Sequence, residues 1–421
     1  MTRPLLHTLT LTALLLLTAA GQTKEPVILQ NADIFSGRRL DNGEDVRELE
    51  GNVRFRQGNV RVWCDRAVQY LNRNEIELNG NVRIVRDTVT LTSRKGRYYG
   101  DKRRADGEGN VRLKTPHVTL LADIGSYDMD RDQAFFQRNV RVIDSSSTIH
   151  CEQLTYFERE RRSVAMLNVR IVNPSDNVTM YGHHLVHLDS TGYSRMTEEP
   201  RLLQIDTAAS GEIDTLAVRG VVMESFDDSS QKLVVTDSVV IVRGAMAARC
   251  GLLLYHTQQE RIELFSRPVV WYDENQVTGD TILLHLRDDR LVSAAIRTRA
   301  FVASLADSAF PLRYNQLTGR SILLRFEENK LRETLVERNA VSLYFLFDEG
   351  AGNGVNKTTG DFIRMLFEEG RPKTIHVAAG IEGTYVPETL LERNGIGSVN
   401  LDGFTLRNDR PDHSTVFPPR K

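Results

Sequence analysis

The 421-residue chain has little cysteine, little net charge and, after its first 20 residues, no long apolar run. Its three cysteines, Cys64, Cys151 and Cys250, are too few for a disulfide scaffold, and we interpret them as small buried apolar residues. The balance of 54 Lys and Arg against 56 Asp and Glu excludes the strongly basic field of a general nucleic-acid-binding protein. The missing apolar run excludes a membrane-spanning helix in the mature chain. We therefore expect neither a nucleic-acid partner nor a membrane span.

The N-terminus has the pattern of a secretory signal peptide over residues 1–21. Arg3 precedes an apolar run from Leu5 to Ala20, and small residues lie before Gly21. The run is short for a membrane-spanning helix, which needs about 20 residues. An uncleaved anchor is the alternative. The pattern predicts an exported protein.

A phrase that returns at a fixed interval dominates the rest of the sequence. Asn-Val-Arg recurs every 29 residues, starting at Asn52, Asn81, Asn110, Asn139 and Asn168. A fixed period of this size indicates one supersecondary unit stacked on itself. Looser units continue at intervals of up to 39 residues, starting at Pro200, Ser238, Pro268, Ala300 and Asn339. The sequence thus predicts an elongated stack of about nine or ten units.

Apolar and polar residues alternate with period 2 inside each unit, which predicts an all-β chain. The inward-facing positions, which are our candidate ligand-contact residues, are Val53, Phe55, Val82, Ile84, Val111, Leu113, Val140, Val142, Val169 and Ile171. The outward positions carry a ladder of arginines, at Arg54, Arg83, Arg112, Arg141 and Arg170. We expect these arginines to pair with the recurrent acids Asp65, Asp123 and Glu152, or else to meet an anionic ligand. Asn79-Gly80-Asn81 predicts a tight hairpin, because Asn and Gly tolerate positive φ.

Composition along the chain predicts five segments. After the signal peptide come an N-terminal lead-in (22–50), a regular array (51–198), a less regular array (199–390) and a flexible C-terminal tail (391–421). No nucleophile elbow, phosphate loop or zinc-protease motif is present. The acidic run Asp128–Asp132 lacks the Gly and Glu of a calcium loop, so we expect no metal there. We accordingly predict no catalytic residue, no metal and no cofactor.

The repeated Gly-Asn-Val-Arg phrases, the Ala122-Asp123 and Gly279-Asp280 strands and the aromatic strands that follow resemble the OstA/LptA-like family. This resemblance implies a periplasmic β-jellyroll of lipopolysaccharide transport that carries acyl chains in its interior and adds partner jellyrolls at its edge strands. It also implies a periplasmic protein, associated with the outer membrane or not, that has no enzymatic activity. The alternative is a purely structural envelope β-solenoid with a closed core. Sequence leaves open whether the interior is packed or open to lipid.

Overall fold

The structure is a computed structural model that describes residues 25–419 except 145–146, 176, 208–212, 288–289, 329 and 369–370. The expected signal segment (1–21) lies outside the described residues. Within the described part, no helix is long and apolar enough to cross a membrane.

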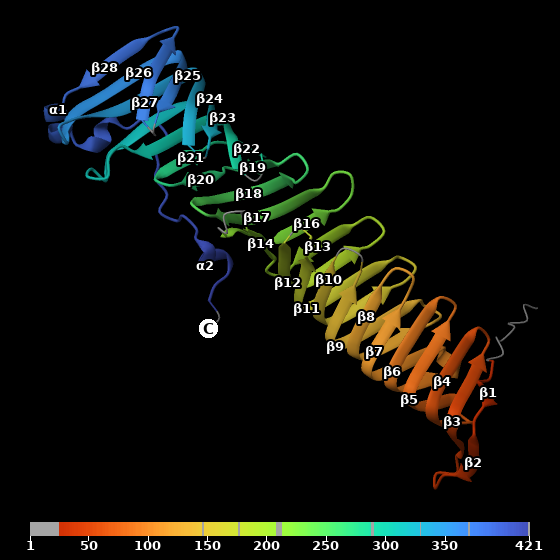
Figure 1. Ribbon diagram of the computed structural model, residues 1–421. Coiled ribbons are helices and arrows are strands. Elements are labelled where there is room, and N and C mark those ends of the chain that lie inside the picture. The colour runs from red at the N-terminus through yellow and green to blue at the C-terminus, as the bar shows by residue number, and fades with distance from the viewer. Residues whose placement is uncertain are drawn as a thin grey trace, which may run out of the picture.

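The chain forms one elongated antiparallel sheet, with 28 strands among the described residues (Figure 1). Each 29-residue repeat supplies two long strands, and each strand pairs with the next one along the chain. The regular strands are β3 (Asp45–Gln57), β4 (Val60–Tyr70), β5 (Glu75–Arg86), β6 (Val89–Tyr99), β7 (Arg104–Lys114), β8 (Thr119–Asp128), β9 (Gln133–Ile143), β10 (Thr148–Phe157), β11 (Arg162–Asn173) and β12 (Val178–Leu188). The all-β repeat stack predicted from the sequence is confirmed.

Every long strand crosses a crease that folds the sheet into two facing layers. In β5, Gly80 and Asn81 have φ values of 74° and 45°, and the pairing register shifts across them. Two residues of one strand then oppose one residue of its neighbour, which is a β-bulge. The Asn-Gly-Asn sequence therefore does adopt positive φ, but the predicted hairpin is wrong. The same backbone geometry bends one continuous strand.

We call the two layers A and B. Layer A contains segments such as residues 45–50 and 66–70, and layer B contains segments such as 53–57 and 60–63. At the crease, valines lie opposite small residues: Val53 pairs with Cys64, and Val82 pairs with Ser93. All three cysteines are free and buried, and burial raises the pKa of each thiol to about 12. This agrees with their interpretation as small apolar residues.

The first strand and several of the later ones are broken in two at the crease. Pro200 and Pro268 lie at two of these breaks, where proline has no N–H to give to the ladder. The half-strands are β1 (Ile28–Asn31), β2 (Ile34–Arg39), β13 (Tyr193–Thr197), β14 (Arg201–Thr207), β15 (Ile213–Arg219), β16 (Val222–Phe226), β19 (Arg261–Phe265), β20 (Val269–Tyr272), β21 (Asn275–Thr278), β22 (Thr281–Arg287), β27 (Arg371–Ala378) and β28 (Glu382–Val386). The unbroken ones are β17 (Lys232–Arg243), β18 (Met246–His256), β23 (Arg290–Leu305), β24 (Tyr314–Glu327), β25 (Lys330–Asp348) and β26 (Ala351–Glu368).

Three of the loose units start one residue earlier than the sequence predicts. The second positive-φ residue of each crease is Glu199, Arg267 and Arg299, rather than Pro200, Pro268 and Ala300. The shift matters because side chains alternate between the two faces of a strand. It turns Leu202 inward, a position that the sequence assigns to the outer face.

Residues 391–417, which make up most of the expected flexible tail, instead pack along the outer face of layer B. We call residues 388–417 the C-terminal strap; it contains α1 (Glu388–Asn394), η2 (Ile396–Val399) and α2 (His413–Val416), and the other short helix is η1 (Gly100–Lys102). Leu391 is fully buried beside Phe345, and Val416 is fully buried on Ala217 and Val240. The strap thus runs back from the end of the array to its middle (Figure 1). Its few, widely spaced apolar residues explain why composition indicated a flexible tail.

Candidate functional site

The interior between the layers is tightly packed in the first half of the molecule. Nine of the ten predicted inward residues are at most 3% exposed and belong to one continuous core. Their period-2 assignment to the inner face is therefore right. Ile171 is only partly buried.

Polar contacts join the free ends of the two layers in this half, opposite the crease. The Tyr98 hydroxyl in layer A donates to Gln57 Oε1 in layer B at 2.5 Å, and Gln57 Nε2 donates to the Gly100 carbonyl at 3.1 Å. Farther along, Arg86 of layer B forms an ion pair with Asp132 of layer A and donates to the Met129 carbonyl.

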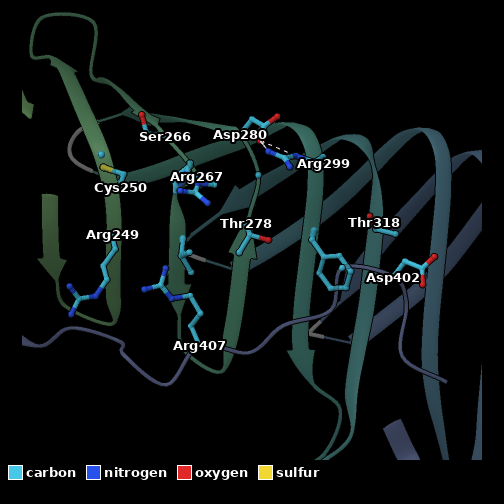
Figure 2. Close-up of a pocket in the computed structure, with 16 residues that line it drawn as sticks. Arg249, Cys250, Ser266, Arg267, Thr278, Asp280, Arg299, Thr318, Asp402 and Arg407 are labelled. Atoms are coloured by element: carbon cyan, nitrogen blue, oxygen red, sulfur yellow. Dashed lines mark hydrogen bonds and ion pairs between the residues drawn. The ribbon is translucent and has the colours of Figure 1, made fainter. Parts of the chain in front are cut away.

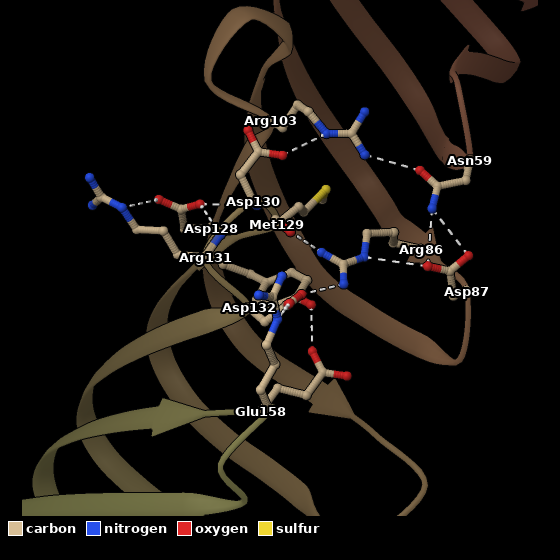
Figure 3. A network of polar contacts seen from close by, with 12 residues as sticks. Asn59, Arg86, Asp87, Arg103, Asp128, Met129, Asp130, Arg131, Asp132 and Glu158 are labelled. Carbon is tan, nitrogen blue, oxygen red and sulfur yellow. Dashed lines mark hydrogen bonds and ion pairs between the residues drawn. The ribbon is translucent and has the colours of Figure 1, made fainter.

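Figure 3 shows how this network extends through Asn59, which accepts from Arg103 at 3.0 Å and donates to Asp87. Arg103 also contacts Asp130, and Asp128 accepts from the backbone of Asp130 and Arg131. The acidic run at 128–132 thus stabilises its own turn and helps to join the two layers.

A cavity of about 1250 Å³ lies farther along, in the middle of the molecule. It is bordered by turns of both layers, including residues 173–175 of layer B and 189–192 of layer A. Apolar side chains from the core line it: Ile171, Val178, Met180, Leu202, Leu216, Leu233 and Tyr255. Leu202 and Leu216 are 5% and 8% exposed, so the floor of the cavity is continuous with the core. Here the apolar interior reaches a space large enough for a ligand.

The rim of the cavity is polar. Asp144, Asp189 and Asp227 lie on it together with Gln204 and the inward-facing His187. Burial lowers the pKa of His187, and the nearby carboxylates oppose that shift without reversing it. The His187 ring is therefore neutral at neutral pH, with Nδ1 at 2.9 Å from the Ser194 hydroxyl. Lys232 adds a cation to the same lining. An apolar floor under a polar rim suits an amphipathic molecule.

A second groove, of about 860 Å³, lies outside layer B beneath the C-terminal strap (Figure 2). Arg249, Arg267, Arg299 and Arg407 line it. Arg249 and Arg407 pair with Asp409 of the strap, and Arg299 pairs with Asp280. These contacts fasten the strap and the crease, so three of the four arginines have structural roles.

The expected pairing of the arginine ladder with the recurrent acids is wrong. Asp65 accepts a hydrogen bond from the Asn81 side chain at 3.0 Å, and Asp123 accepts one from Asn139 at 2.7 Å. The acid lies opposite the bulge, so the nearest donor is the crease asparagine of the following strand. At a later crease Arg299 takes the same place and bonds Asp280.

Of the ten predicted site residues, Ile171 alone lines the central cavity. Leu202, Leu216 and Leu233 were missed, because they fall in a unit without the Asn-Val-Arg phrase. Met180 was missed because it lies on the second strand of the unit that starts at Asn168, away from the phrase itself. The remaining signal was the period-2 alternation of apolar and polar residues. It points to these positions once the register of the loose units is corrected to start at Glu199.

Two overlapping matches to known families cover most of the array. Residues 24–199 match a family described as OstA-like protein, and residues 117–290 match one described as LptA/(LptD N-terminal domain) LPS transport protein. A search of curated proteins finds no match. Among solved structures, the extracellular domain of a protein described as a one component system, BT4673 from B. thetaiotaomicron, is 7% identical over 87% of this chain and 98% of that chain. Its TM-score of 0.09 is too low to support any argument.

Proposed function

This chain is an OstA/LptA-like protein over residues 24–290, and from this premise we propose that it binds lipopolysaccharide or a related glycolipid in the periplasm and passes it toward the outer membrane. The observation that carries the proposal is the central cavity. Its floor of Ile171, Leu202 and Leu216 is apolar and continuous with the core, as acyl chains require. Its polar rim can accept hydrogen bonds from sugar hydroxyls.

In this proposal the acyl chains enter between the layers at the cavity, and neither catalysis nor a cofactor takes part. The ten inward residues from Val53 to Ile171 would line the path where the layers separate. The tight packing around Phe55 and Leu113, each 1% exposed, means that the layers must move apart for lipid to advance there.

Partner jellyrolls would add at the two ends of the sheet. Ile34 and Phe35 of β2 are 60% and 57% exposed at one end, and Tyr385 of β28 is 52% exposed at the other. Exposed apolar residues on terminal strands favour strand addition, in which backbone groups of a second chain continue the ladder.

Substitution of the cavity floor tests the proposal. Leu216→Gln should lower the glycolipid that co-purifies from a lipopolysaccharide-producing host by about tenfold, because it places an amide where an acyl chain would pack. The matched control is Leu312→Gln, since Leu312 is 77% exposed. Equal glycolipid in both variants, measured by mass spectrometry on folded protein, would favour the alternative of a closed structural scaffold.

A further inference from the structure

The outer face of layer B in the first half is rich in cations, and its acids Asp65, Asp123 and Glu152 lie at the crease. Away from the crease, its outward residues alternate with buried ones along strands β3 to β11, and none of those described there is Asp or Glu. We call its eight exposed cations the basic strip: Arg54, Arg56, Arg61, Arg83, Arg112, Lys114, Arg141 and Arg170. Among the described residues none of the eight has an ion pair.

The strip is built around one continuous cross-strand row. Direct neighbours in that row, from β3 to β12, are Arg54, Trp63, Arg83, Thr92, Arg112, Leu121, Arg141, His150, Arg170 and Tyr181. Along this row, every second strand therefore carries an arginine, and the strands between them carry an uncharged or weakly basic residue. Successive arginines lie two strands apart, or about 9.6 Å, and the row from β3 to β11 spans about 38 Å.

The opposite outer face has a different composition. On layer A, Arg97 pairs with Glu77 and Arg66 pairs with Glu50. Charge on that face is balanced locally. The uncompensated cations of layer B are thus a property of one face, although the net charge of the whole chain is −2.

The C-terminal strap covers the same face of layer B only in the second half. Its last described contact on the sheet is Phe417 against Tyr181, with ring centroids 5.7 Å apart. Tyr181 is the direct neighbour of Arg170, the last arginine of the strip. The described part of the strap therefore stops beside the last arginine of the strip and does not extend over β3 to β9.

We propose that the basic strip is a docking surface for an anionic, phosphate-bearing lipid surface. Charge complementarity carries the inference: phosphate groups accept the guanidinium fork, and the strip repeats that fork over an extended face rather than in one pocket. Apolar side chains between the cations, such as Trp63, Leu121 and the 39% exposed Ile143, suit the interfacial region of a bilayer.

A shallow groove on this face offers a binding site for individual lipid headgroups. It has a volume of about 710 Å³, and Arg112, Arg141 and His150 line it together with two acids at its crease end, Asp123 and Glu152. Asp123 already accepts a hydrogen bond from the Asn139 side chain. Burial lowers the pKa of His150, and the nearby charges of Arg170 and Arg141 lower it further. This docking surface is on the outside of the sheet and does not depend on acyl chains entering the cavity.

Vesicle binding tests the docking surface. The whole purified protein should bind phosphatidylcholine vesicles that contain phosphatidylglycerol and not vesicles of phosphatidylcholine alone. The triple variant R83Q/R112Q/R141Q should lose on the order of 100-fold in partition coefficient, since each arginine near an anionic surface contributes about fivefold. These side chains are exposed, so the thermal unfolding midpoint should not fall.

The matched control removes three cations from the outer face of layer A, as R66Q/K95Q/R97Q, and should retain binding within about threefold. Equal losses in the two variants would mean that net charge alone matters and would overturn the docking surface. Binding to soluble polyphosphate without binding to anionic vesicles would overturn it too, in favour of a soluble polyanion.

Discussion

At the scale of single residues, the crease depends on backbone conformations that most side chains avoid. Gly80 has φ of 74°, and a Cβ there would fall on the Asp65 side chain. Gly80→Ala should therefore destabilise the protein by at least about 1 kcal/mol, seen as a lower thermal unfolding midpoint. Gly37→Ala is the control, since a Cβ at Gly37 meets nothing within 4 Å. An unchanged midpoint for Gly80→Ala would contradict the role of the bulge.

His187 gives the cavity a pH dependence with a definite sign. Burial lowers its pKa in the folded protein, so the unfolded chain binds a proton more readily between about pH 6.5 and the lowered value. Its contribution to stability is therefore lost as pH falls through that window. His187→Gln should show a smaller fall in unfolding midpoint than wild type between pH 7 and pH 5. The exposed His117→Gln variant is the control and should behave like wild type. Parallel curves for His187→Gln and wild type would mean that the half-buried His187 ring is not responsible.

At the scale of elements, the C-terminal strap is held by side chains far from it in sequence. The Gln276 side-chain amide forms two hydrogen bonds with the strap backbone. Its Nε2 donates to the Thr405 carbonyl at 2.7 Å, and its Oε1 accepts from the Arg407 N–H at 2.8 Å. Farther along, Gln316 donates to the Asn400 side-chain oxygen and accepts from the Leu401 backbone N–H. The buried ion pair between Arg313 and Glu388 fixes its beginning.

Removal of residues 388–421 should therefore expose the outer face of β20 and β21. Trp271 is 5% exposed and pairs across strands with Gln276, so its fluorescence should shift to longer wavelength in the truncated protein. The chain has two tryptophans, and a Trp63→Phe background isolates the signal. The unfolding midpoint should fall as well, because the packing of Leu391 and Val416 against the sheet is removed with the strap. Unchanged emission and midpoint would mean that the strap does not cover this face.

Local patterns predicted the strands and their inward faces, because a period of 2 is imposed by backbone geometry alone. They predicted positive φ at Gly80 and Asn81 but not its use, since a bulge and a hairpin turn require similar dihedral angles. The partners of Asp65 and Gln276 depend on which strands become neighbours. The cavity depends on how closely two layers approach, and no single strand carries that information.

For the whole molecule, the two layers enclose one apolar core that runs from Val27 to Met365. The layers are joined by polar contacts in the first half, border a cavity in the middle and are covered on one outer face by the strap in the second half. Our account assigns lipid entry to that cavity and attachment to an anionic lipid surface to the basic strip. Cavity and strip lie on different sides of layer B, so separate substitutions can test them.

Photo-crosslinking from the cavity tests the central claim most directly. A photoreactive residue would replace Ile171 or Leu216, with Phe135 as the control, since Phe135 is 39% exposed on the outer face of layer A. The protein would be irradiated in a lipopolysaccharide-producing host and its adducts identified by mass. We predict glycolipid adducts at Ile171 and Leu216 and none at Phe135. Well-folded protein without adducts at either cavity position would contradict a lipid-carrying interior.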